Sequence, residues 1–242
     1  MSSRSTPSYD TPPDETRLWR YYPRRRFAQL LGEGLFVPTF GKLREREGDP
    51  FEAALVPGEL AHLEKVNREH PFAPSLARQM DDVRADHIYV SCWCESDNEG
   101  MDMWTRYVGT EADGGVAIVS DVRSLRAALA NADSPVAIGR CSYDLDMNRE
   151  GHVTGMELHY RKRPCFRHER EVRATFVHPF RPRAGFTVLV DPVALILEVR
   201  LCPDASDKFR HAVGSMLAEH GVPTDRVRRS EIDDRPPPVP LR

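Results

Sequence analysis

The chain has 242 residues, of which 40% are hydrophobic and 29% charged, and its formal net charge is −3. These values predict a soluble globular domain with a sizeable core. They do not favour a molecule built to coat nucleic acid or an acidic membrane surface. No apolar run approaches the roughly 20 residues that a membrane helix needs.

The two ends differ from the body of the chain. Residues 1–16 are polar and contain prolines, and we expect a disordered lead-in there. Residues 233–242 predict an extended, proline-rich tail, because each proline fixes its backbone and removes a donor. The stretch between them, 17–232, is expected to form one domain. The five cysteines are an odd number in a long chain, which argues against a disulfide framework and favours a reducing compartment, the cytoplasm.

Hydrophobic periodicity predicts alternating strands and helices from residue 18 onward. The expected strands and extended segments are 18–22, 34–40, 87–93, 115–119, 136–143, 167–177, 186–190 and 195–201. The expected helices are 23–32, 101–107, 122–129 and 204–220. The charged stretch 42–86 has few large apolar positions and is expected to be a peripheral helical insertion. Short or loop-like gaps join the later strands, so the pattern predicts an α+β fold with a mixed, largely antiparallel sheet and surrounding helices.

The sharpest chemical feature is the run Glu169-Arg170-Glu171-Val172-Arg173. Alternate residues of a strand share a face, so Glu169, Glu171 and Arg173 are expected on the face opposite the apolar residues. Two carboxylates spaced in this way lie roughly 6–7 Å apart. Such a pair can do acid–base work or stabilise a cation. The same alternation is also typical of a strand that simply faces solvent, since charged residues are mostly exposed.

Four other residues are candidates for binding a ligand. Arg20 lies between aromatic residues, and Ser91 comes near the end of an apolar strand. Trp93 follows Ser91 by two residues, and Tyr107 lies on the short helix that follows. Dense aromatic residues are more often core than a ligand cage, and this is the interpretation we favour for Trp104.

Several short segments occur in the order typical of one bacterial family. They are Leu18-Trp19-Arg20-Tyr21, Asp49-Pro50-Phe51-Glu52, Val90-Ser91-Cys92-Trp93, Met103-Trp104 with Tyr107, Gly115-Val116-Ala117-Ile118, Lys162 and Glu169-x-Glu171-x-Arg173. Together they span most of residues 18–202 and resemble the family catalogued as domain of unknown function 2971 (DUF2971). The family name carries no activity. The resemblance suggests a role in a bacterial stress or conflict system, such as phage defence.

A more distant resemblance is to ADP-ribosyltransferases of the arginine–serine–glutamate type. Arg20, Ser91 and Glu169-x-Glu171 occur here in the order of that motif. In those enzymes the arginine holds the NAD phosphates, and the serine helps to position the nicotinamide ribose. The last glutamate stabilises the oxocarbenium-like charge as nicotinamide leaves. The resemblance implies an ADP-ribosyltransferase-like fold, NAD as a substrate, Glu171 as the catalytic residue and Glu169 as the residue that orients the acceptor.

Three alternatives stay open. A nuclease would need acidic ligands for a divalent metal, for which the run with Asp144, Asp146 and Glu150 is available, but no lysine partner at a fixed strand spacing is evident. A zinc site could be drawn from Cys92, Cys94, Cys141, Cys165 and His168. Zinc sites usually present two clean paired motifs, so we expect buried free cysteines and no metal. Finally, the basic and aromatic residues could bind a phosphate-bearing ligand or nucleic acid without chemistry, as a sensor does.

Overall fold

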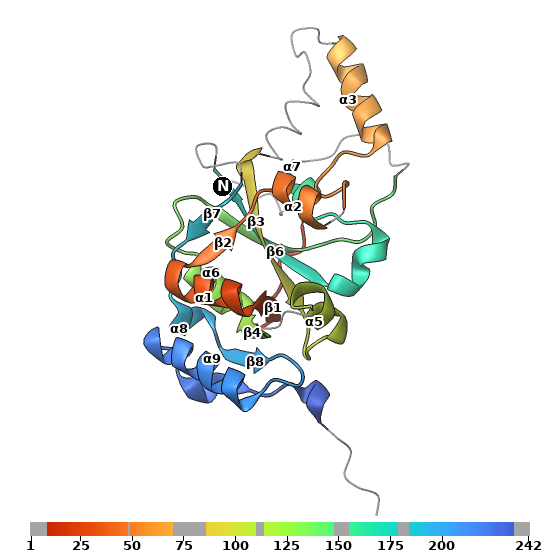
Figure 1. Ribbon diagram of the computed structural model, residues 1–242. Coiled ribbons are helices and arrows are strands. Elements are labelled where there is room, and N and C mark those ends of the chain that lie inside the picture. The colour runs from red at the N-terminus through yellow and green to blue at the C-terminus, as the bar shows by residue number, and fades with distance from the viewer. Residues whose placement is uncertain are drawn as a thin grey trace, which may run out of the picture.

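The computed structural model of the protein describes residues 9–47, 49–69, 86–109, 114–147, 155–178 and 184–234 (Figure 1). Within these ranges, the main sheet holds seven strands in the order β5-β6-β3-β1-β4-β8-β9. Their bounds are β1 Arg17–Pro23, β3 Ile88–Glu95, β4 Gly115–Asp121, β5 Val136–Arg140, β6 Glu171–Val177, β8 Glu198–Leu201 and β9 Val227–Arg228. Every neighbouring pair is antiparallel except β8 and β9. The predicted mixed, largely antiparallel sheet is confirmed.

A small antiparallel ribbon and several helices surround the main sheet. The ribbon pairs β2 (Leu35–Val37) with β7 (Phe186–Val188). The α-helices are α1 Arg24–Glu33, α2 Phe40–Glu47, α3 Pro57–Glu69, α5 Met101–Tyr107, α6 Val122–Ala128, α7 Gly155–His159, α8 Pro192–Leu195 and α9 Asp207–Glu219. Three short 3₁₀ helices are η1 Pro164–Glu169, η2 Thr224–Arg226 and η3 Glu231–Asp233. None of the helices described is long and apolar enough to cross a membrane.

Helix α1 shows how local sequence sets the element that borders the site. Pro23 precedes its first turn, where the missing donor does no harm. The helix continues past Gly32, where we expected it to end, and stops at Gly34, whose φ of 107° is open to glycine but strained for other residues. A Cβ atom at Gly34 would also collide with the Val188 carbonyl of β7. The apolar side chains of the helix face the core, and they are Phe27, Leu30 and Leu31.

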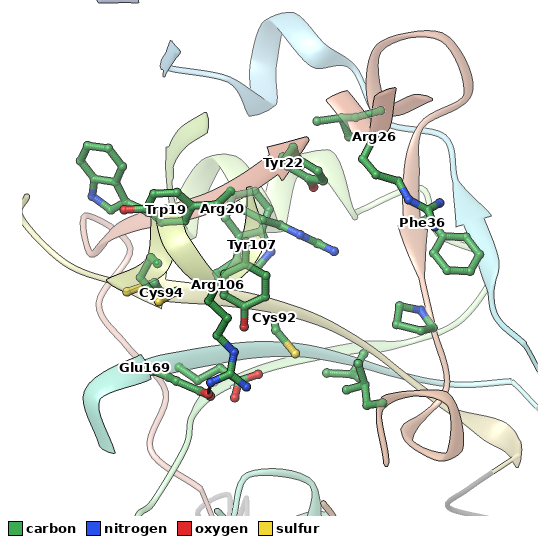
Figure 2. A pocket seen from close by; sticks show the side chains of 18 of the residues that line it. Trp19, Arg20, Tyr22, Arg26, Phe36, Cys92, Cys94, Arg106, Tyr107 and Glu169 are labelled. Atoms are coloured by element: carbon green, nitrogen blue, oxygen red, sulfur yellow. Dashed lines mark ion pairs between the residues drawn. The ribbon is translucent and has the colours of Figure 1, made fainter. Parts of the chain in front are cut away.

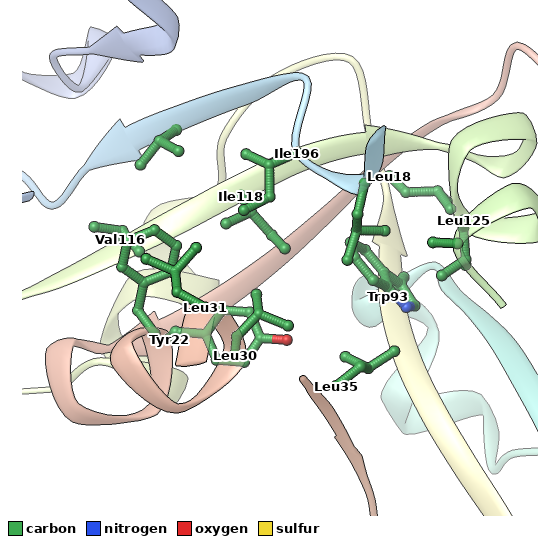
Figure 3. Packing of buried hydrophobic residues seen from close by; sticks show 14 of the residues in the cluster. Leu18, Tyr22, Leu30, Leu31, Leu35, Trp93, Val116, Ile118, Leu125 and Ile196 are labelled. Atoms are coloured by element: carbon green, nitrogen blue, oxygen red, sulfur yellow. The ribbon is translucent and has the colours of Figure 1, made fainter. Parts of the chain in front are cut away.

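The larger apolar core lies between one face of the main sheet and the helices α1, α6 and α9 (Figure 3). Leu18, Ile118 and Val172 bring β1, β4 and β6 into this core, and each is fully buried. Burying a side chain of this size contributes roughly 1.5–3 kcal/mol relative to leaving it exposed. The strand periodicity predicted this face correctly, since its residues alternate with those of the other face.

The opposite face of the sheet is also covered. Trp19 and Tyr21 of β1 pack there against Met103 and Trp104 of α5. The rings of Tyr21 and Trp104 meet edge to face, with centroids 4.8 Å apart. Trp104 is therefore a core residue, as its type favours. Because both faces of the central strands are buried, a polar residue on them needs a partner in the protein.

Two segments differ from their expected placement. Residues 9–16 belong to the stretch expected to be disordered, yet Tyr9 stacks on Tyr160, and Asp10 bonds to Arg140 through its backbone and side chain. Residues 42–86 were expected to be peripheral, and α3 does project from the body (Figure 1). The segment between α2 and α3 nevertheless reaches the interior, where Glu52 is buried. Residues 1–8, 70–85 and 235–242 lie outside the described residues.

Candidate functional site

The site begins where two neighbouring strands separate. β1 and β3 pair over only two positions, Leu18 with Glu95 and Trp19 with Cys94. Each of these strands pairs over seven positions with its other neighbour, β4 or β6. Both strands then contribute to the lining of a pocket of about 640 Å³, β1 with residues 19–23 and β3 with residues from 90 to 94. Ligand pockets commonly hold about 300–1,000 Å³, so this one has room for a nucleotide-sized molecule.

Helices, loops and the strands β2 and β6 complete the lining (Figure 2). They contribute Arg26, Gln29, Leu30, Gly34, Phe36, Pro38, Leu43, Met103, Arg106, Tyr107, Phe166, Glu169 and Glu171. Five of the six candidate residues therefore line one pocket, namely Arg20, Trp93, Tyr107, Glu169 and Glu171. The sixth, Ser91, is completely buried and lies behind the wall.

Arg20 is held in the wall by uncharged groups. Its Nη1 donates a hydrogen bond to Ser91 Oγ, which also accepts one from Trp93 Nε1 at 3.0 Å. The guanidinium carbon of Arg20 lies 5.2 Å from the ring centroid of Tyr22 and 5.7 Å from that of Trp93. Among the ion pairs of the described residues, none includes Arg20. Arg20 therefore keeps a net positive charge at the pocket surface, where an anion can use it.

The two glutamates do not share a strand, and this part of the sequence prediction is wrong. β6 begins at Glu171, whereas Glu169 is the last residue of the 3₁₀ helix η1. Arg170 between them is left-handed, with φ at 42°. A non-glycine residue in this conformation costs roughly 1–2 kcal/mol, and here the backbone of Arg170 is tied to β3 by the hydrogen bond from Glu95 N at 2.8 Å.

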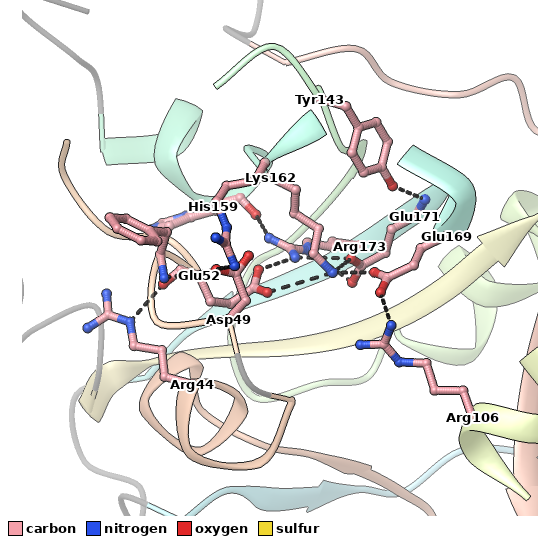
Figure 4. Close-up of polar contacts among 12 residues, drawn as sticks. Arg44, Asp49, Glu52, Arg106, Tyr143, His159, Lys162, Glu169, Glu171 and Arg173 are labelled. Carbon is pink, nitrogen blue, oxygen red and sulfur yellow. Dashed lines mark hydrogen bonds and ion pairs between the residues drawn. The ribbon is translucent and has the colours of Figure 1, made fainter. Parts of the chain in front are cut away.

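The two carboxylates meet on a lysine instead. Lys162 Nζ lies 2.9 Å from Glu171 Oε2 and also bonds to Glu169 Oε2 (Figure 4). Arg173 holds Glu171 through two hydrogen bonds of 3.0 Å each and reaches Glu52 as well. All five side chains are buried. The alternative interpretation, in which the charged face of this strand simply meets solvent, is therefore wrong, and Arg173 is completely buried.

One more cation completes this group, which we call the ion cluster: Glu52, Glu169, Glu171, Arg106, Lys162 and Arg173. Arg106 Nη1 lies 2.7 Å from Glu169 Oε1, as an ion pair outside hydrogen-bond alignment. With three carboxylates and three cations, the formal charges of the ion cluster cancel. Buried charges persist only when they are paired in this way. The formal charges of the ion cluster therefore add no net charge to the pocket, whereas Arg20 adds a positive charge to its wall.

The pKa values follow from these contacts. Burial alone would raise the pKa of Glu171, but Arg173 and Lys162 hold it well below the ordinary range. Burial raises the pKa of Glu52 despite the same two cations. Burial acts to lower the pKa of Lys162, but Glu171 and the other carboxylates hold it above its usual value. Glu171 is consequently ionised at neutral pH.

Cys92 also lines the pocket, next to Glu171. Burial and the neighbouring Glu171 carboxylate raise the pKa of the Cys92 thiol well above its ordinary value. A nucleophilic or metal-binding cysteine needs the thiolate form, which this environment disfavours. Cys92 therefore acts in the wall as a small neutral group.

Sequence reasoning did not assign roles to three members of the ion cluster. Glu52 and Lys162 appeared only among the segments that resemble a family, and Arg106 was not singled out. No periodicity signals them, because they come from an irregular segment, a loop and a helix that meet only in the fold. Two further ion pairs tie the same region to the body: the buried pair of Arg161 Nη1 with Glu59 Oε1 at 2.6 Å, and the pair of the half-buried Arg163 Nη2 with Asp49 Oδ1 at 3.0 Å.

Glu171 lines a second, smaller pocket of about 360 Å³ as well. Arg140, Tyr143 and Arg170 are among the other residues of its wall. The Tyr143 hydroxyl accepts a hydrogen bond from the Glu171 backbone N–H at 2.6 Å. Of the six candidate residues, Glu171 is therefore the one that lines both pockets.

The metal-dependent alternatives find little support in the geometry. In the part of the chain that the structure describes, no three His, Cys, Asp or Glu side chains are grouped so that they could hold a metal ion. Asp144 accepts a hydrogen bond from the hydroxyl of its neighbour Ser142. Glu150, the third residue of the acidic run, lies outside the described residues.

Comparison with known proteins finds no family and only a weak likeness to two solved structures. No family model and no curated protein matches the chain, so the resemblance to DUF2971 is not confirmed. Two solved structures of DarT from Thermus sp. 2.9 are similar to it. The structure in complex with ADP-ribosylated ssDNA is 12% identical, covers 92% of this chain and 96% of that one, and has a TM-score of 0.39. The structure in complex with carba-NAD+ is 13% identical, covers 90% and 100%, and has a TM-score of 0.35. At these values the likeness places no residue of this chain in a role.

Proposed function

We propose that this protein is an ADP-ribosyltransferase-like enzyme that uses NAD. One observation carries the proposal: an arginine without a carboxylate partner and a buried, ionised glutamate line the same pocket. Arg20 is suited to the diphosphate, because a guanidinium presents planar donors to phosphate oxygens. Glu171 is suited to the other end of the reaction, because its carboxylate stays ionised at neutral pH.

The chemistry would proceed by loss of nicotinamide. The bond between the ribose C1′ and the pyridinium nitrogen breaks, its electron pair passes to nitrogen, and neutral nicotinamide leaves. Positive charge develops on the ribose, and a fixed carboxylate next to it lowers the barrier without having to reorganise. An acceptor nucleophile or water then bonds to C1′ and gives up a proton. In this proposal Glu169 orients the acceptor, and Trp93 and Tyr107 provide aromatic walls.

Ser91 has a different role from the one its motif implies. Its hydroxyl oxygen accepts hydrogen bonds from both Arg20 and Trp93, and the side chain is fully buried. In the proposal, Ser91 is a positioning residue that fixes the arginine, and it does not touch the ribose.

A second candidate function is a sensor that binds the nucleotide without turning it over. The charge balance of the ion cluster favours it. Lys162 and Arg173 both contact Glu171, so they offset part of the field that would stabilise a cation. Arg20 alone is sufficient for an anion-binding pocket.

The deciding experiment compares Glu171→Gln with Glu52→Gln. Both variants remove one buried carboxylate that contacts Arg173, but Glu52 does not line the pocket. Nicotinamide release from NAD is followed by chromatography, and NAD binding by calorimetry. DarT was solved with carba-NAD+ and ADP-ribosylated ssDNA, so NAD and single-stranded DNA are the first donor and acceptor to add.

The enzyme proposal expects Glu171→Gln to lower nicotinamide release at least about 100-fold, the scale of losing one electrostatic stabiliser. NAD binding should change little, and Glu52→Gln should keep its release. Equal release by wild type and Glu171→Gln would remove Glu171 from the mechanism. Tight NAD binding with no release by wild type, with or without acceptor, would establish the sensor instead.

The binding half of the proposal is tested with Arg20→Gln against Arg25→Gln. Arg25 is exposed, lies five residues away and is not part of the pocket wall. A hydrogen bond to a charged group contributes about 1.5–3 kcal/mol. Arg20→Gln should therefore weaken NAD binding roughly 10- to 100-fold, and Arg25→Gln should leave it unchanged. Equal affinity of both variants would contradict the assignment.

A further inference from the structure

The end of the pocket formed by β2 and α1 carries an exposed aromatic ring. β2 alternates, with Leu35 and Val37 buried and Phe36 exposed to 41%. Phe36 is also part of the pocket wall. Figure 2 shows Phe36 and Arg26 on one side of the pocket and Glu169 and Arg106 on the other, with the side chain of Arg20 between them. The ring therefore lies at the end opposite the ion cluster.

The backbone on the neighbouring strand fixes where this ring can lie. Gly185 precedes β7 and has a φ of +132°. A Cβ atom there would come within 2.7 Å of Phe36 Cζ and 2.6 Å of the Val37 carbonyl oxygen. The glycine thus lets the ring rest against bare backbone while much of its surface stays exposed. An aromatic ring held in this way at a pocket wall can stack on a flat ligand at small cost in side-chain entropy.

A hydrogen-bond donor of known orientation lies in the same wall. Arg26 Nη1 donates to Gln29 Oε1 at 3.0 Å. A guanidinium can only donate, so the oxygen of the Gln29 amide must be the atom that faces it. This fixes the amide, and its NH₂ group is the part left for a ligand. In the described residues, no hydrogen bond involves Gln29 Nε2.

We propose that Phe36 and Gln29 form a nucleobase subsite, so that the pocket takes a dinucleotide rather than a mononucleotide. The base stacks on Phe36, and a ring nitrogen or carbonyl oxygen of the base accepts a hydrogen bond from Gln29 Nε2. Arg20 lies between this subsite and the ion cluster, as a phosphate-binding group between two nucleosides must. The inference rests on the proposed function for the ligand at the inner end, where the nicotinamide riboside half of NAD would bind.

The chemistry of the subsite favours a base over other flat or apolar groups. Arg26 and the Gln29 amide nitrogen are donors, which suits the acceptor-rich edge of a heteroaromatic ring and not an acyl chain. Base stacking on an aromatic side chain tolerates different bases and contributes about 5- to 150-fold in affinity by alanine substitution. The adenine of NAD supplies both the flat face and the acceptor nitrogens.

The test measures the affinities of NAD, nicotinamide mononucleotide and AMP by calorimetry. Phe36→Ala should weaken NAD and AMP binding roughly 5- to 150-fold. It should leave nicotinamide mononucleotide, which lacks the second base, unchanged. The matched control is Leu189→Ala, because Leu189 is 81% exposed, follows β7 and is not among the residues of the pocket wall. It should bind all three ligands as wild type does.

Gln29→Glu provides a second test. This variant keeps the shape of the side chain and the hydrogen bond from Arg26 but lacks the NH₂ donor. The ratio of NAD to mononucleotide affinity should fall about 2- to 10-fold, the range of one hydrogen bond. The subsite is overturned if Phe36→Ala binds NAD and AMP like wild type, or weakens the mononucleotide equally. Wild type that binds AMP in a Phe36-dependent way but not NAD supports the subsite and overturns the NAD-using function. Binding of none of the three overturns both.

Discussion

The two faces of β6 are both buried, but in different ways. One face, formed by Val172, Ala174 and Phe176, belongs to the apolar core. The other face, formed by Glu171, Arg173 and Thr175, is covered by charged and polar partners. The apolar face gains stability from area alone, whereas the charged face needs each partner in place.

This difference shows what is at risk when one residue is lost. A lost apolar side chain leaves a cavity, and the loss of stability depends on how far the surrounding residues relax to fill it. A lost cation leaves a buried carboxylate unpaired, and every carboxylate that shared this cation is destabilised. Arg173 donates hydrogen bonds to both Glu52 and Glu171, so its loss should destabilise both carboxylates together.

The largest effects are expected from Arg173→Met and Phe176→Ala. The first removes a cation from the charged face of β6, and the second removes a ring from its apolar face. Each should lower the free energy of unfolding by about 3–5 kcal/mol at pH 7. The loss in Arg173→Met should shrink as the pH falls toward 4, because Glu52 and Glu171 can then be protonated. The loss in Phe176→Ala should not change with pH. Urea denaturation at several pH values measures the free energy of unfolding of both variants. A loss in Arg173→Met that does not change with pH would contradict the proposed difference between the two faces.

A smaller effect concerns the acid stability of the wild type. The pKa of Glu171 in the folded state lies below the value near 4.5 that it has when unfolded. Its stabilisation is therefore complete above that pH and is lost as the pH falls toward the lowered pKa. Glu171→Gln should flatten this acid slope by up to about 1.4 kcal/mol per pH unit.

Glu52→Gln is the control for that slope. The pKa of Glu52 is raised, so the folded state takes up its proton more readily than the unfolded state. Removing it should not flatten the acid slope. A flatter slope in Glu52→Gln than in Glu171→Gln, measured by thermal or urea unfolding, would show that the two roles are reversed.

The smallest effect is expected in thiol labelling, which compares a cysteine next to the ion cluster with a buried cysteine among aromatic side chains. Cys92 lies next to Glu171, and Cys94 lies in the aromatic cluster with Trp19. Burial raises the pKa of Cys94 to about 12, so only roughly one thiol in 10⁴ is ionised at pH 8. Iodoacetamide at pH 8 should label the exposed Cys165 well before Cys92 or Cys94, as followed by mass spectrometry. Labelling of Cys92 as fast as Cys165 would show that the pocket opens readily.

The sequence by itself determined most of the elements and one face of the sheet. Helix α5 has the predicted bounds, and strands such as β4 extend the predicted ones by a residue or two. Alternation along β6 separated the apolar residues from the charged ones correctly. These features are local, because they depend on a period of two or 3.6 residues that side chains in one segment share.

Only the tertiary structure decided what the charged face meets. Alternating Glu and Arg look the same whether they face water or a buried partner, and Glu52 and Lys162 come from segments without a matching period. The left-handed turn at Arg170, which separates Glu169 from β6, has no hydrophobic signature either. The pocket itself exists because β1 and β3 part after two paired positions. Such a divergence depends on how distant strands pack, and a single strand does not encode it.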